Sequence, residues 1–418
     1  MVAREFEQHF YVTQEKIELA LETARHEAPI LREVTDDTFS LYISIPFCPS
    51  RCSYCSFVSH DITSKRAKDI LPVYVDRLCE ELEQISQKVK GTGLRLTTVY
   101  FGGGTPSLLK IPQIASILQA VTQHFAVDSH AEITLEGNPD SLGREYLKSL
   151  HELGINRLSI GVQSFQPQLL RSLGRIHSSR QAVEAVENAA WAGFDNLSAD
   201  LMYGLPGQTV QMAADDLSQL LRLPLCHASV YSLILEPGTC LYHDVTTGMV
   251  SLPPDDQVEK MASVVHQVFK RYGFDHYEIS SYARPGRRSR HNVKYWTYVP
   301  YLGFGVSAHS FDGHVRSAHI SNIPQYIRYA GRQSVLAESV VIDVNRAQED
   351  YCFLALRMRD GIAYDDFARR FGVSVESVFG KVVDKLVKQG LLERKEGGCR
   401  LTSLGLAYGN YVFSQFIR

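Results

Sequence analysis

The sequence predicts an α/β protein: a partial (β/α)6 barrel followed by a mostly helical, winged-helix-like domain. Three observations predict this fold class. Short apolar and β-branched runs alternate with longer stretches of helical periodicity over the first three quarters of the chain. About six such β–α units are present, where a complete barrel of this kind has eight. From about residue 334 onwards, helical periodicity dominates until a final hairpin-like segment.

The expected strands are rich in β-branched and aromatic residues, and apolar strands of this kind are typical of a parallel sheet that helices cover. These strands are Leu41–Pro46, Thr97–Phe101, Glu132–Glu136, Arg157–Gly161, Leu197–Tyr203 and Ser229–Leu235. The amphipathic stretches between them predict the covering helices. They are Ile70–Val89, Ile111–Phe125, Arg144–Leu153, Ser179–Ala192 and Gln211–Leu223.

Three regions are expected along the chain. Residues 1–40 form an N-terminal helical extension, in which Val12–Arg32 has helical periodicity. Residues 41–330 form the barrel together with a ligand-facing segment. Residues 331–418 form the C-terminal winged-helix-like domain, with helices at Tyr364–Phe371 and Val375–Gly390 and a hairpin in Leu391–Leu401. Winged helices often bind DNA, but Val382–Gln389 carries few basic residues, so no nucleic-acid partner is expected.

The composition is that of an ordinary globular protein, with 44% hydrophobic and 21% charged residues among 418. A net charge of −3 produces no general attraction for nucleic acid or anionic membranes. No apolar run reaches the roughly 20 residues of a membrane span, and the N-terminus does not resemble a secretory signal. We therefore expect a cytoplasmic protein without an integral membrane segment. Five scattered cysteines are expected to pack as small apolar residues: Cys79, Cys226, Cys240, Cys352 and Cys399.

Polar and glycine-rich residues fall at or just after the predicted strands. In strand order they are Cys48, Gly102–Thr105, Glu136, Gln163, Asp200 and Tyr231. The ligand site of a parallel barrel lies at the carboxyl ends of its strands. The sequence therefore predicts that one site collects all of these residues.

Three cysteines follow the first strand with the spacing C-x3-C-x2-C: Cys48, Cys52 and Cys55. Thiolates bind both zinc and iron–sulfur clusters. A structural zinc site needs a fourth ligand, for which His60 is the nearest candidate, but the spacing is unlike common zinc fingers. A four-iron cluster on three thiolates keeps one iron open, as catalytic metal sites do. A [4Fe–4S] cluster is therefore the favoured interpretation.

This cysteine motif after the first strand of a partial barrel resembles the radical S-adenosylmethionine (SAM) superfamily. The resemblance implies that the open iron binds the amino and carboxylate groups of SAM. It further implies that an electron from the cluster cleaves SAM to methionine and a 5′-deoxyadenosyl radical.

Further segments resemble the oxygen-independent coproporphyrinogen III oxidase-like family. They are Tyr100-Phe-Gly-Gly-Gly-Thr-Pro106, Glu136-Gly-Asn-Pro139, Ser159-Ile-Gly-Val-Gln-Ser-Phe165, Leu173-Gly-Arg-Ile-His177, Asp200-Leu-Met-Tyr-Gly-Leu-Pro-Gly207, Tyr277-Glu-Ile-Ser280 and Gly303-Phe-Gly-Val-Ser-Ala-His-Ser310. The resemblance implies that SAM is held by Tyr42, Tyr54, Gly103, Gly104, Thr105, Glu136, Gln163, Arg175 and Asp200. The glycine run is expected to let backbone N–H groups approach the charged ligand closely.

Two features separate the branches of this family. Oxidases that make protoporphyrinogen usually carry another cysteine two positions after the triplet, where this chain has Phe57. The segment His291-Asn-Val-Lys-Tyr-Trp296 resembles a signature of the heme-chaperone branch. The resemblance thus implies a protein that binds heme and passes it to apo-hemoproteins. An oxidase acting on coproporphyrinogen III and a radical methyl or methylene transferase using two SAM molecules stay open as alternatives, and each would need an electron donor such as flavodoxin or ferredoxin.

Candidate tetrapyrrole-binding residues lie in the same region. Arg284, Arg287, Arg288 and Arg290 form a basic cluster that could pair with propionate carboxylates, or could form a solvated loop. His291 and His309 are candidate axial ligands of heme iron. The alternative for each histidine is a hydrogen-bonded core or loop residue, and the oxidase branch places the position of His309 near SAM.

Overall fold

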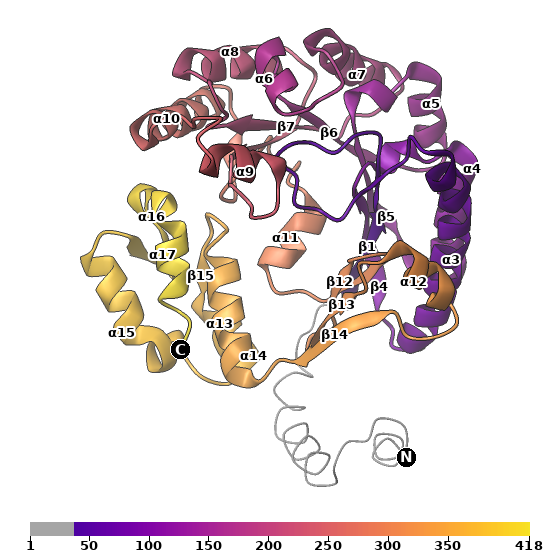
Figure 1. The fold of residues 1–418 in the computed structure, drawn as a ribbon. Coiled ribbons are helices and arrows are strands. Elements are labelled where there is room, and N and C mark those ends of the chain that lie inside the picture. Colours follow the sequence, from indigo (N-terminus) through magenta and orange to yellow (C-terminus); the bar gives the residue numbers. More distant parts are fainter. Residues whose placement is uncertain (1–36) are drawn as a thin grey trace. The chain divides into compact units, whose positions relative to one another are not determined.

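The computed structural model describes residues 37–418, which divide into two compact units (Figure 1). Residues 37–295 and 299–340 form the first, called the barrel unit here, and residues 296–298 and 341–418 form the C-terminal unit. The expected N-terminal helix Val12–Arg32 lies outside the described residues.

Six parallel strands form the centre of the barrel unit and confirm the predicted fold class. In chain and spatial order they are β1 (Thr38–Ile45), β4 (Arg95–Gly103), β5 (Val127–Gly137), β6 (Arg157–Gln163), β7 (Leu197–Tyr203) and β8 (His227–Ser232). The sheet does not close on itself. Beyond β8 it continues antiparallel into β10 (Ser281–Ala283) and β9 (Asp275–His276). Beyond β1 it continues through β11 (Tyr301–Phe304), β12 (His309–Phe311), β13 (Val315–His319) and β14 (Leu336–Val341).

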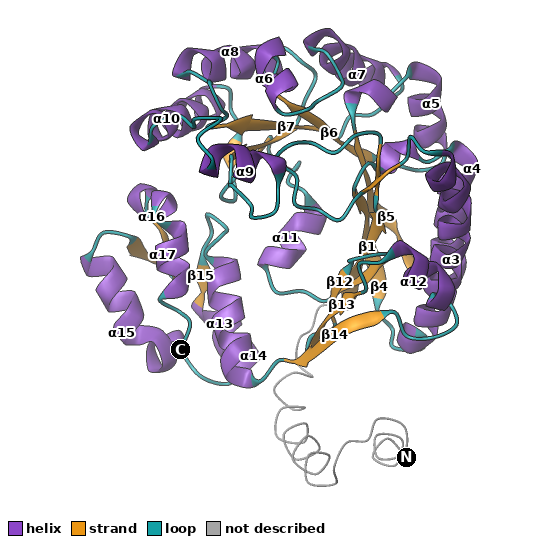
Figure 2. Ribbon diagram, in the orientation of Figure 1, coloured by secondary structure: helices purple, strands orange, loops and turns teal. Residues whose placement is uncertain are grey.

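Helices cover the outer side of this curved sheet, as Figure 2 shows. They are α3 (Lys65–Val89), α4 (Ile111–His124), α5 (Arg144–Glu152), α6 (Pro167–Ser172), α7 (Ser179–Trp191), α8 (Val210–Leu220) and α10 (Asp255–Arg271). Helix α3 begins five residues earlier than the sequence predicts because the Ser64 side chain accepts a hydrogen bond from Ala67 N and caps it. Outward-facing strand residues such as Leu41, Val99 and Leu158 are fully buried beneath the helices. Burial of each such side chain stabilises the folded state by about 1.5 to 3 kcal/mol.

The inward-facing residues of the same strands are polar, and strand register aligns them in rows. Tyr42 lies beside Tyr100, Tyr100 beside Thr134, and Thr134 beside Arg157 on four neighbouring strands. A complete (β/α)8 barrel fills its interior with layers of branched apolar side chains. The polar rows indicate that the interior of this barrel is part of a ligand site rather than a packed core.

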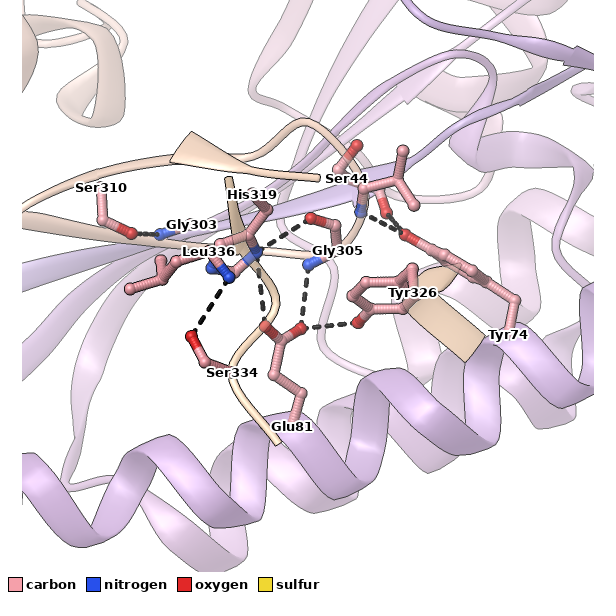
Figure 3. Close-up of polar contacts among 11 residues, drawn as sticks. Ser44, Tyr74, Glu81, Gly303, Gly305, Ser310, His319, Tyr326, Ser334 and Leu336 are labelled. Atoms are coloured by element: carbon pink, nitrogen blue, oxygen red, sulfur yellow. Dashed lines mark hydrogen bonds and ion pairs between the residues drawn. The ribbon is translucent and has the colours of Figure 1, made fainter. Parts of the chain in front are cut away.

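A buried hydrogen-bond network fastens one loop at the carboxyl end of the barrel (Figure 3). Glu81 of α3 accepts hydrogen bonds from the Tyr326 hydroxyl at 2.6 Å and from Gly305 N at 3.0 Å. The His319 ring lies 3.3 Å from the same carboxylate. Burial raises the pKa of Glu81, and these partners oppose the increase. The network holds the Gly303–Ser310 segment, which belongs to the motifs singled out in the sequence.

The C-terminal unit combines helices with a three-stranded antiparallel sheet in the order β15-β17-β16. Helix α13 (Val344–Ala355) and β15 (Ile362–Ala363) precede α14 (Tyr364–Phe371) and α15 (Val375–Lys388). The hairpin β16 (Leu392–Lys395) and β17 (Gly398–Leu401) follows, and then α16 (Ser403–Ala407) and α17 (Gly409–Ser414). The helix–helix–hairpin order is that of a winged helix, as expected. Buried Phe367, Phe379 and Phe416 form its core.

The scattered cysteines differ in their surroundings. Cys226, Cys352 and Cys399 are buried and Cys79 is half-buried, as expected for small apolar residues. Cys240 is exposed, so the expectation that it packs in the interior is wrong. It begins α9 (Cys240–Thr246), directly after the capping residue Thr239, where the side chain points away from the core. Within residues 37–418, no helix has both the length and the apolar content to cross a membrane.

Candidate functional site

A single cavity of about 530 Å³ opens at the carboxyl ends of the barrel strands. This volume lies in the usual range for small-molecule sites. Most residues predicted from the sequence line it: Cys48, Cys52, Tyr54, Cys55, Gly103, Gly104, Thr105, Glu136, Gln163, Arg175, Asp200 and Tyr231. The fold therefore brings together side chains that are up to 183 positions apart in the chain, as the rule for parallel barrels predicts.

The three cysteines lie in a loop, residues 48–60, whose two ends are joined. The short strands β2 (Phe47–Cys48) and β3 (His60–Asp61) pair in parallel and close the loop at its base. Ser53, in the middle of the loop, donates from its N–H to Leu173 O and accepts from Leu241 N. His60, the candidate fourth zinc ligand, is exposed on β3.

The thiol groups have polar neighbours suited to charged sulfur. The Thr105 hydroxyl donates to Cys48 Sγ at 3.5 Å, and Arg175 Nη1 donates to Cys52 Sγ at 3.5 Å. Burial raises the pKa of Cys48 and Cys55, and coordination to a metal would deprotonate both. Among the described residues, no three His, Cys, Asp or Glu side chains converge as they would on a single metal ion. Three cysteines around one cavity fit the thiolate ligand set of a multi-iron cluster.

The glycine-rich segment after β4 approaches the first strand closely. Gly103 has a φ of 104°, and a Cβ on Gly104 would lie 2.6 Å from Phe47 O. Gly104 N donates to Ile45 O and Thr105 N to Phe47 O. The N–H groups of Gly104 and Thr105 thus hold the cysteine loop against β4. The expectation that the glycine run offers its N–H groups to a ligand is therefore wrong for these two residues.

Two half-buried carboxyl groups face the cavity from β5 and β7. Glu136 accepts a hydrogen bond from the Tyr100 hydroxyl at 2.7 Å, and Asp200 accepts one from the Ser159 hydroxyl at 3.3 Å. Burial raises the pKa of Glu136 to about 7 and that of Asp200 to about 6. A cationic ligand in the cavity would favour the charged form of both. Sulfonium and ammonium groups such as those of SAM fit this part of the site.

Arg175 and Gln163 lie between the carboxyl groups and the cysteine loop. Arg175 Nη2 donates to Asn138 Oδ1 at 2.8 Å and to Gly161 O at 2.6 Å, while its buried Nε has no partner among the described residues. Gln163 ends β6 at a register shift with a φ of 67°, which is rare for a residue with a side chain. Such strain commonly accompanies functional sites. Gln163 also accepts a hydrogen bond from the Tyr231 hydroxyl.

Several predicted residues lie outside the cavity lining. Tyr42 stacks on Tyr100, with ring centroids 6.1 Å apart, and only Tyr100 reaches the cavity. Arg287 pairs with Asp195, which precedes β7, and Arg290 donates to His130 O near the beginning of β5. Both arginines are thus at the amino ends of the strands, opposite the cavity. The Arg288 guanidinium lies over the Tyr277 ring.

The candidate heme histidines are not in the cavity lining either. His291 of α11 (Arg290–Trp296) is buried, with Nδ1 2.8 Å from Thr98 Oγ1 and Nε2 2.8 Å from the Tyr295 hydroxyl. Burial, with Arg157 and Lys294 nearby, lowers the pKa of His291 to about 3. Because both ring nitrogens are engaged, this geometry favours the hydrogen-bonded core role over iron ligation. His309 is exposed at the start of β12.

The sequence reasoning missed several cavity residues, among them Asn138, Arg157 and Asn292. Asn138 lies within the motif Glu136-Gly-Asn-Pro139, so it could have been predicted as a site residue from the sequence. Asn292 follows His291 and reaches the cavity in its place. Arg157 begins β6, far from the carboxyl end of the strand, and only strand register reveals that its side chain points inward.

This chain is similar to known protein families and to known proteins over most of its length. Residues 42–220 match the radical SAM superfamily, and residues 349–408 match the HemN C-terminal domain. The heme chaperone HemW of Bacillus subtilis is 36% identical over 380 residues, covering 90% of this chain and 99% of that protein. The heme chaperone HemW of Lactococcus lactis is 33% identical over 378 residues, covering 90% and 97%.

A solved structure confirms the fold. The radical SAM enzyme coproporphyrinogen III oxidase (HemN) of Escherichia coli superposes with a TM-score of 0.79, covering 93% of both chains. Its sequence identity is 22%, so the likeness concerns the arrangement of the chain and leaves the activity open.

Proposed function

Since this chain belongs to the heme chaperone HemW family within the radical SAM superfamily, we propose that it binds heme and delivers it to apo-hemoproteins. The superfamily implies a [4Fe–4S] cluster and SAM. The observation that carries the proposal is the similarity to heme chaperones of Bacillus subtilis and Lactococcus lactis over nearly their whole length.

In this proposal Cys48, Cys52 and Cys55 hold the cluster and leave one iron open. The closed base of the loop and the donors at two of the sulfurs support it. When bound, the cluster supplies an electron for the reductive cleavage of SAM. The cysteine loop carries Phe57 at the position where the oxidases that this chain resembles usually have a further cysteine.

The remaining polar residues of the cavity bind SAM. Arg175 attracts its carboxylate by charge, and Nε, which has no partner among the described residues, donates a hydrogen bond to it. Glu136 and Asp200 accept hydrogen bonds from ribose hydroxyls or balance the positive charge of the ligand. Gln163 and Tyr231, which are joined by a hydrogen bond, limit the space beside them. Tyr42 does not contact SAM itself but positions Tyr100, on which it stacks.

The apolar edge of the cavity supports binding of a large flat ligand such as heme. Phe57 and Ile234 line the cavity and are 67% and 68% exposed. Exposed apolar groups around a polar site are typical of binding surfaces. A tetrapyrrole could cover these side chains and extend its polar substituents inward.

The proposal includes an electron donor of the flavodoxin or ferredoxin class and a cytoplasmic location. Thiolate ligands need a reducing compartment, and all eight cysteines of this chain are free.

Two measurements test the proposed function. Anaerobically reconstituted, reduced protein is incubated with SAM and coproporphyrinogen III, and protoporphyrin and 5′-deoxyadenosine are quantified together. A chaperone forms no protoporphyrin. Protoporphyrin that rises in step with 5′-deoxyadenosine would show an oxidase and overturn the proposal.

The second measurement titrates the protein with heme and then adds apomyoglobin as an acceptor. We expect a heme absorbance band that saturates and then moves to the acceptor. A protein that binds no heme, or never releases it, is not a chaperone. Methylated products formed from SAM would identify a transferase instead.

A further inference from the structure

Arg157 places two guanidinium N–H groups without hydrogen-bond partners in the described part of the chain at the bottom of the cavity. Its side chain is 1% exposed and lines the cavity from the start of β6. Neither Nε nor Nη1 has a hydrogen-bond partner among residues 37–418. A buried charge without hydrogen bonds is costly, so native proteins almost always satisfy one with a partner or a ligand.

Thr134 is a second unsatisfied group directly beside it. Thr134 and Arg157 are register partners on β5 and β6, and the hydroxyl of fully buried Thr134 also has no partner in the described residues. Asn292 of α11 lines the same cavity. Arg157, which lines the cavity, and Thr134, its buried neighbour outside the lining, are called the floor here. The floor offers a cation to a ligand at the bottom of the barrel.

The carboxyl groups near the floor determine which kind of anion can bind there. Glu136 and Asp200 face the same cavity, and the charge of Arg157 opposes part of the increase that burial causes in the pKa of both. A phosphate dianion would be repelled by these carboxyl groups. A carboxylate carries one charge and matches the planar fork of a guanidinium.

We propose that the floor binds a carboxylate group of the ligand through the Arg157 guanidinium. Assigning that carboxylate to a tetrapyrrole propionate rests on the proposed function. The carboxylate of SAM is the other source. Arg175, 3.5 Å from Cys52 Sγ, stands next to the cysteine loop and is the nearer cation for SAM.

The first test changes only the ligand. The unaltered protein, with its cluster reconstituted, is titrated with heme and with heme dimethyl ester, in which both propionates are esterified. We expect the ester to bind about tenfold or more weakly, since it loses the charge-assisted hydrogen bonds. Equal affinities would overturn the floor assignment while leaving the proposed function intact. Binding of neither compound would overturn both.

The second test changes the protein. Arg157→Gln should weaken heme binding about tenfold or more and abolish the preference for heme over its ester. Arg157→Lys, which keeps the charge, should restore part of that preference. SAM affinity, measured by equilibrium dialysis, should be the same in all three proteins. If Arg157→Gln weakens SAM binding and leaves heme binding unchanged, the carboxylate on the floor belongs to SAM and the tetrapyrrole assignment is wrong.

Discussion

Replacing Glu136 with Gln tests the electrostatics of the cavity directly. Burial raises the pKa of Glu136 from 4.5 to about 7, so the folded protein holds this proton more tightly than the unfolded chain does. Below about pH 4.5 the carboxyl group is protonated in both states and does not oppose folding. Between about pH 4.5 and about pH 7 the unfolded chain loses this proton while the folded protein keeps it, so the stability falls as the pH rises and the loss is complete above about pH 7.

The difference between 4.5 and about 7 corresponds to about 3 kcal/mol, at about 1.4 kcal/mol for each tenfold change in proton affinity. This is an upper value, because water in the cavity solvates part of the charge. Glutamine keeps the shape and an oxygen that can accept from the Tyr100 hydroxyl but does not titrate. We therefore expect Glu136→Gln to gain about 1 to 3 kcal/mol of stability relative to the parent between about pH 5 and about pH 8.

Urea unfolding followed by circular dichroism at several pH values measures this gain as the shift in midpoint multiplied by the slope. Glu187→Gln, on the exposed side of α7, is the matched control and should show no gain. A stability difference between Glu136→Gln and the parent that does not change with pH would refute the reasoning.

Three further predictions concern the cluster, the buried network and His291. Cys52→Ala should abolish the visible absorbance and bound iron of the reconstituted protein, whereas Cys240→Ala should keep both; a full iron content in Cys52→Ala would contradict the ligand assignment. Tyr326→Phe removes the hydroxyl that donates to Glu81 and should lower the free energy of unfolding by about 1 to 2 kcal/mol in urea, an effect whose absence would count against the network. His291→Ala should destabilise the protein by about 2 kcal/mol and leave heme affinity within about threefold; a larger loss of heme affinity would identify it as a heme ligand after all.

Much of the site followed from the sequence because its residues sit at fixed places on the strands. The alternation of apolar runs and helices predicts the parallel sheet, and parallel strands must place their carboxyl ends together. The three cysteines lie within eight residues, so their spacing alone predicts a metal or cluster site. Glu136, Gln163 and Asp200 could be assigned to one cavity before the fold was known, since they lie within, at the end of or just after predicted strands.

The side of a helix or loop that faces the cavity could not be predicted in this way. His291 and Asn292 are neighbours in the chain, yet the histidine is buried in a hydrogen-bonded core and the asparagine lines the cavity. The basic cluster before them lies at the amino ends of the strands because β10 and α11 return the chain there. Such placement depends on contacts between distant segments, which local patterns do not encode.

The sequence by itself determined the fold class, the family and the cysteine motif, because periodicity and spacing are local properties of the chain. Only the tertiary structure decided which charges meet inside the barrel. The register between β5 and β6 places Thr134 beside Arg157, and a shift of β6 by one residue would turn the Arg157 side chain into the helical layer. The unsatisfied floor of the cavity exists only because that register is set by packing along the whole sheet.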